Sequence, residues 1–84
     1  MKENEYSTND IYLSSFLMTQ GKYELKEIRD NGTGRKLFVF EPKPDQSLIL
    51  EFYNGTAKVP AIKLLESLQT LKSAIYVLNS KGKT

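Results

Sequence analysis

Apolar residues near the N-terminus recur at helical spacing. Leu13, Phe16 and Leu17 follow one another at steps of three and four, which places them on one face of a helix. The preceding segment Ser7-Thr8-Asn9-Asp10 has the spacing of an N-terminal capping box. We therefore expect a helix from about Thr8 to Gln20, ended by the glycine that follows it.

The pattern then changes to two β-prone segments, residues 22–30 and 35–42. They flank Asn31-Gly32-Thr33-Gly34, whose glycines and asparagine tolerate the positive φ angles of tight turns, so the sequence predicts a β-hairpin. Ile28 falls out of phase with the alternation of the first strand, which indicates a bulge or an early strand end. Pro42 ends the second strand because proline cannot donate to the ladder.

Both faces of the second strand are apolar. Phe38 and Phe40 share one face, and Leu37 and Val39 share the other. We expect helices to cover one face and a partner to cover the other.

Residues 46–53 are open to two interpretations. The pairs at i and i+4, such as Leu48 with Phe52, favour a short helix with Asp45 as its N-cap and Asn54-Gly55 as its end. The same apolar run also suits a third strand. The two flanking signals lead us to predict the helix.

The last element is an amphipathic helix from about Pro60 to Leu78. Its expected inward side consists of Ala61, Leu64, Leu65, Leu68, Leu71, Ile75 and Leu78. Lys63, Glu66, Thr70 and Ser73 fall on the opposite side.

These elements predict an α+β fold in the order α-β-β-α-α, with helices packed on a two-stranded antiparallel hairpin. We expect the 84 residues to form a single small domain, residues 1–84, with residues 1–6 and 79–84 flexible. A domain of this size buries a modest fraction of its surface, so a partner or a second copy would add stability.

The composition excludes several classes of catalytic and metal-binding site. The chain has no cysteine and no histidine, which excludes disulfides, thiolate metal sites and imidazole catalysis. Its carboxylates are scattered singly, so no acid–base pair or metal site is predicted. We expect no enzyme activity, no metal and no cofactor.

The first ten residues carry acidic groups and no apolar stretch, so no signal peptide is predicted, and no apolar run approaches the length of a membrane span. We expect a cytoplasmic protein without membrane contact.

Charge is unevenly distributed along the chain. Residues 1–55 carry seven basic and nine acidic side chains, whereas residues 56–84 carry five lysines against Glu66 alone. The candidate binding residues are Lys58, Lys63, Lys72, Lys81 and Lys83. They suit an acidic partner or nucleic acid, and they also suit a solvated helix and tail.

Two further features bear on nucleic-acid or phosphate binding. Phe38 and Phe40 beside Arg35 and Lys36 resemble a strand that stacks bases, although both rings also suit a core. The loop at 32–34 offers glycine amides to an anion, but it lacks the spacing and the following helix of a phosphate-binding loop. For both features, a structural role in the core or in a turn is the stronger interpretation than nucleic-acid or phosphate binding.

The order of motifs resembles a small domain family of bacteria and their phages whose function is unassigned. The resemblance rests on STNDIYLSSFLMTQG, a hairpin ending in KLFVFE, and EFYNGTAKVPAIKLLESLQTLKSAIY, and it spans about Tyr6 to Tyr76. It brings no catalytic residues, and it implies an accessory protein of a phage or prophage.

The sequence therefore predicts a non-catalytic accessory protein that acts as a protein-interaction module, either with an unknown protein partner or as a homodimer. The alternative is a nucleic-acid-binding accessory protein that uses the C-terminal lysines. A ligand site at the glycine-rich hairpin is a third and weaker hypothesis.

Overall fold

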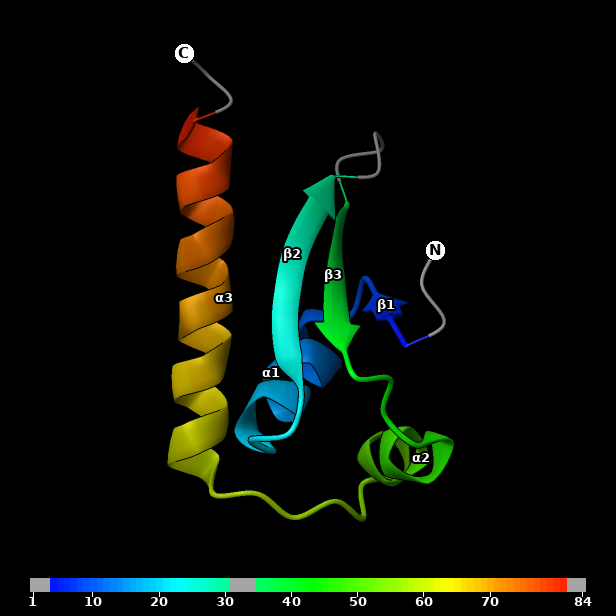
Figure 1. Ribbon diagram of the computed structural model, residues 1–84. Helices are drawn as coiled ribbons and strands as arrows, with labels where there is room; N and C mark the ends of the chain where they lie inside the picture. Colours follow the sequence, from blue (N-terminus) through cyan, green and yellow to red (C-terminus); the bar gives the residue numbers. More distant parts are fainter. Residues whose placement is uncertain (1–3, 31–34, 82–84) are drawn as a thin grey trace.

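The computed structural model describes residues 4–30 and 35–81 of the chain (Figure 1). The elements are β1 (Tyr6–Thr8), α1 (Ile11–Thr19), β2 (Glu24–Asp30), β3 (Lys36–Glu41), α2 (Gln46–Asn54) and α3 (Ala61–Lys81). The α+β class is confirmed. The predicted order is wrong because a strand precedes the first helix.

The sheet has three antiparallel strands in the order β1-β3-β2, where a two-stranded hairpin was predicted. Strand β1 pairs with β3 through Tyr6 opposite Phe40 and Thr8 opposite Phe38. A segment of three residues carries too little periodicity to be recognised as a strand, although aromatic and β-branched residues favour one. The third strand therefore had no clear signal in the sequence pattern.

Helix α1 begins three residues later than predicted, because Asp10 and not Thr8 is its N-cap. The Asp10 carboxylate accepts hydrogen bonds from the backbone amides of Tyr12 at 2.9 Å and Leu13 at 3.2 Å. The Thr8 hydroxyl accepts one from the Asp10 amide at 3.1 Å. Thr8 therefore stabilises the turn between β1 and α1.

The irregularity predicted in the first hairpin strand is confirmed. The register between β2 and β3 shifts between Leu25 and Glu27, so that Leu25 lies opposite Phe40 and Ile28 lies opposite Phe38. This bulge brings Leu25 and Ile28 to the same face of the sheet. The hairpin loop at 31–34 lies outside the described residues.

Helices α1 and α3 pack together beside one face of the sheet (Figure 1). The centre of the core consists of Leu13, Phe16, Leu17, Phe38, Phe40 and Leu71. Both phenylalanines of β3 are at most 1% exposed, so they are core residues and offer no free ring for base stacking.

On the opposite face of β3, Val39 is covered by the chain itself. Val39 lies opposite Ser7 of β1 and Glu27 of β2, and it is fully buried within the single chain. Leu37, on the same face, is half-buried. The burial of Val39 therefore needs no second molecule.

Residues 46–54 form helix α2, which confirms the helical interpretation. Gly55 ends the helix in the left-handed conformation, with φ of +77°. Asp45 occupies the N-cap position, but its side chain makes no capping hydrogen bond. Phe52 stacks on Phe16 of α1 at 5.1 Å between ring centroids, which joins α2 to the core.

Helix α3 extends to Lys81, three residues beyond the predicted end. Leu71 is fully buried and Leu64 and Ile75 pack against the core, as expected. Leu65 is 60% exposed and Leu78 is 43% exposed, so the prediction that both face inward is wrong. Ala61 is also exposed. The sheet and α1 cover only part of this long helix, and its remaining apolar side chains stay on the surface.

Candidate functional site

The lysines predicted as binding residues do not gather on one described face. Lys58 lies in the connection before α3, and Lys63 and Lys72 lie on α3 itself. Nine positions separate Lys63 from Lys72, which at about 100° per residue places them on opposite sides of the helix. Lys81 lies at the end of α3, and Lys83 lies outside the described residues.

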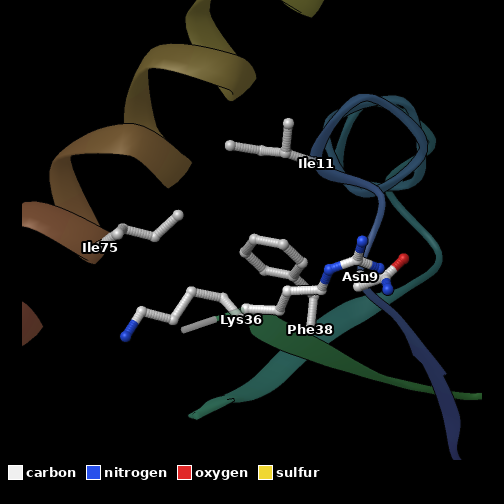
Figure 2. A pocket seen from close by; sticks show the side chains of 6 residues that line it. Asn9, Ile11, Lys36, Phe38 and Ile75 are labelled. Atoms are coloured by element: carbon white, nitrogen blue, oxygen red, sulfur yellow. The ribbon is translucent and has the colours of Figure 1, made fainter. Parts of the chain in front are cut away.

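A small crevice lies between the start of α1, the start of β3 and α3 (Figure 2). It has a volume of about 290 Å³ and is lined by Asn9, Ile11, Arg35, Lys36, Phe38 and Ile75. Figure 2 shows the Phe38 ring at its centre, with Ile11 above it and Ile75 facing it from α3. The crevice is therefore an opening at the margin of the core, with basic side chains beside it.

Two interactions reduce the capacity of this crevice for an anion. Lys36 forms an ion pair with Asp30, with 3.2 Å between Nζ and Oδ2. Two amides at the N-terminus of α1 are already engaged by the Asp10 carboxylate. Of the two basic residues that line the crevice, only Arg35 makes no ion pair within the described residues.

A larger and more apolar groove lies between strand β2 and the C-terminal half of α3. Its volume is about 720 Å³. Strand β2 contributes Leu25, Lys26, Glu27 and Ile28, and α3 contributes Thr70, Ser73, Ala74, Val77 and Leu78. Four consecutive residues of β2 line it, so the groove follows the edge of the strand as well as its core face.

The apolar side chains of this groove, which we call the β2–α3 groove, are incompletely covered. Val77 is 50% exposed and Leu78 is 43% exposed. Leu25 and Ile28 are half-buried and pack against the margin of the core. Apolar side chains that gather around an open groove are typical of a binding surface.

Charges of both signs alternate along the same strand. Lys26 Nζ lies 3.7 Å from Glu24 Oε1, and Arg29 Nη2 lies 2.6 Å from Glu27 Oε1. The hydrogen bond from Arg29 lowers the pKa of the Glu27 carboxyl, and the same bond raises the pKa of Arg29. All four side chains are exposed, so they can exchange partners at little cost.

The buried serine hydroxyls of α1 are occupied by hydrogen bonds to the backbone. The hydroxyls of Ser14 and Ser15 are buried, and each donates a hydrogen bond of 2.9 Å to a backbone carbonyl of α1 or its cap. Within residues 4–30 and 35–81, no three acidic residues come together as metal ligands. The same part of the chain has no helix long and apolar enough to cross a membrane.

Sequence reasoning missed the β2–α3 groove. The out-of-phase Ile28 was the available signal, because a bulge that brings Leu25 and Ile28 to one face creates the apolar wall of the groove. The exposure of Leu78 had no comparable signal, because the periodicity of α3 placed it on the inward side.

A family model described as a domain of unknown function, DUF5659, matches residues 3–77. No curated protein and no solved structure matches the chain.

Proposed function

The chain belongs to the DUF5659 family of domains of unknown function, and we propose that it is a non-catalytic module that binds a protein in the β2–α3 groove. The single observation that carries this proposal is the groove itself. It is open and predominantly apolar, and Val77 and Leu78 beside it leave about half of their surface in water. Covering such side chains is favourable by about 25 cal/mol for each Å² of apolar surface removed from water.

The non-catalytic part of the proposal is supported by the absence of histidine and cysteine from the sequence. The buried hydroxyls of Ser14 and Ser15 are held by backbone carbonyls, so a general base does not activate them as nucleophiles. The polar residues of the helical wall, Thr70 and Ser73, are suited instead to hydrogen bonds with a bound chain.

The biological setting is a further part of the proposal. The motif resemblance supports an accessory protein of a phage or prophage. We place it in the cytoplasm because no apolar run in the sequence approaches the length of a membrane span. An open apolar groove on a domain of 84 residues agrees with a role in binding another protein.

Nucleic-acid binding through the C-terminal lysines is the alternative, and the arrangement of the helix supports it less. Lys63 and Lys72 lie on opposite sides of α3, so they cannot contact one phosphate backbone together. A gel-shift measurement at low and at moderate salt separates the two functions, since phosphate contacts weaken steeply with salt. Salt-sensitive binding at low salt would favour the alternative.

Site-specific photo-crosslinking tests the proposed function. A photoreactive amino acid at position 77 lies in the groove, and the same amino acid at position 62 is a matched control, because Ile62 is also exposed on α3 but does not line the groove. In host cells we expect protein adducts from position 77 and few from position 62. Equal yields from both positions would contradict the proposal.

A further inference from the structure

Strand β2 is an open edge of the sheet beside the groove. The order β1-β3-β2 leaves β2 paired on one side only among the described strands. Its outward backbone amides and carbonyls therefore lack a partner strand. Strand β1 is the other edge, but it has three residues against seven in β2. Strand β2 is the longer edge on which another strand can pair.

The bulge decides which side chains of β2 share a face. Leu25 and Ile28 lie opposite the two core phenylalanines of β3 and therefore share the core face. Glu24, Glu27 and Arg29 lie opposite the residues that alternate with those phenylalanines, so they share the outer face. Lys26 is the extra residue of the bulge, next to Glu27, and has no partner in β3. In a regular strand, residues three apart would point to opposite faces.

With these orientations, the side chains of one β2 strand complement those of a second β2 strand that runs antiparallel to it. We infer that the β2–α3 groove binds a second copy of this chain, with the two β2 strands antiparallel about a two-fold axis between Lys26 and Glu27. The facing pairs are then Glu24 with Arg29, Leu25 with Ile28, and Lys26 with Glu27, each formed twice. Opposite charges meet in two of these pairs and apolar side chains meet in the third.

Neighbouring registers lack this complementarity. An axis through Glu27 would place Glu27 opposite its own copy and Glu24 opposite Asp30, so like charges would face one another. An axis through Lys26 would place Lys26 opposite its own copy and Leu25 opposite Glu27. Charge and hydrophobicity therefore both favour the register whose two-fold axis lies between Lys26 and Glu27.

The same arrangement covers the half-exposed side chains of α3. A strand that enters the groove brings its own Leu25 and Ile28 toward Ala74, Val77 and Leu78, which line the helical wall. A two-fold dimer uses the same patch on both copies, and the groove supplies both the edge strand and the apolar wall. This inference rests on the proposed function and specifies its partner.

Light scattering and sedimentation equilibrium over a range of concentrations test the dimer. We expect the wild-type chain to approach twice its monomer mass of 9.6 kDa as concentration rises. The variant Lys26→Glu makes both members of the central facing pair acidic, and Glu27→Lys makes both members basic. Each variant should raise the dimer dissociation constant by at least about tenfold.

Mixing the two variants provides the sharper measurement. In a mixed dimer, the carboxylates at positions 26 and 27 of the Lys26→Glu chain face the ammonium groups at positions 27 and 26 of the Glu27→Lys chain. The mixture should therefore form heterodimers more tightly than either variant forms homodimers. A loss of folding cannot produce this rescue. If the mixture associates no better than its components, the proposed register is wrong.

A substitution in the groove provides a further test of the dimer. Val77→Lys should weaken the dimer, whereas Ile62→Lys, also exposed on α3 but away from the groove, should leave it unchanged. A wild-type monomer at high concentration would overturn the inference. If the monomer still gives adducts with a different protein from position 77, the second copy is excluded and the proposed function stands. If position 77 gives no adducts, both fail.

Discussion

The hydroxyl of Tyr53, on α2, donates a hydrogen bond of 2.7 Å to Oδ2 of Asp10, the N-cap of α1. The other carboxylate oxygen, Oδ1, accepts the backbone amides of Tyr12 and Leu13. One carboxylate therefore caps α1 and ties α2 to its N-terminus, across 43 positions of sequence.

Removal of the Tyr53 hydroxyl tests this link. Tyr53→Phe should lower the free energy of unfolding by about 0.5–1 kcal/mol, because the ring remains while the hydrogen bond is lost at a site that is partly solvated. Urea denaturation followed by circular dichroism measures the change. Tyr12→Phe is the control, since Tyr12 is similarly exposed and the Asp10 carboxylate is bound to its backbone amide and not to its hydroxyl; an equal loss there would contradict the assignment.

The same contact predicts a pH dependence at the alkaline end. Burial, followed by the hydrogen bond and the negative charge of Asp10, raises the pKa of Tyr53 to about 12. A raised folded pKa favours the protonated form, so the contribution to stability is complete below the ordinary tyrosine pKa of about 10 and declines as pH rises toward 12. Ultraviolet titration of the wild type minus Tyr53→Phe should show one tyrosine ionising late. A difference curve centred near pH 10 would refute this expectation.

Substitution of Asp10 separates its two roles. Asp10→Ala removes the N-cap and should cost about 1–2 kcal/mol. Asp10→Asn keeps a good capping oxygen and should cost clearly less, while its loss of charge should move the Tyr53 pKa back toward the ordinary value. Thermal unfolding and ultraviolet titration of both variants measure the two effects. Equal destabilisation by alanine and asparagine would show that capping is not the main contribution.

Leu71 and Leu65 provide a matched pair on helix α3. Leu71 is fully buried and belongs to the core, so Leu71→Ala should cost about 2–5 kcal/mol. Leu65 is 60% exposed, so Leu65→Ala should change stability by about 0.5 kcal/mol or less. Chemical denaturation of both variants checks the contrast. A large loss for Leu65→Ala would restore the inward orientation that the periodicity predicted.

Gly55 tests the end of α2. Its φ of +77° disfavours side chains, although no atom lies within 4 Å of where a Cβ would be placed. Gly55→Ala should therefore cost about 1 kcal/mol through backbone conformation and not through a clash. Gly55→Asn should cost less, because asparagine tolerates this region. If alanine is neutral in thermal unfolding, the helix does not end in this conformation in solution.

The lysines show how local pattern differs from spatial arrangement. The sequence identified five lysines as a charged C-terminal segment, and counting alone supports that description. The side of α3 on which a lysine lies depends on the helical repeat, and this repeat places Lys63 and Lys72 on opposite sides. Lysines that are close together in the sequence therefore do not form one basic face on the helix.

The sequence by itself determined the α+β class and the amphipathic nature of α3, indicated an irregularity at Ile28, and favoured a helix that ends at Asn54-Gly55 over a third strand. Each of these depends on the chemistry of neighbouring residues and on periodicity, which a linear pattern contains. Only the tertiary structure decided that Tyr6–Thr8 is a strand, because three residues become a strand through pairing with β3. It also decided which leucines of α3 are covered, since that depends on which side of the helix faces α1 and the sheet: Leu64 packs against the core and Leu65 is exposed. The β2–α3 groove also depends on tertiary structure, because it forms where α3 lies beside the open edge of β2 without closing over it.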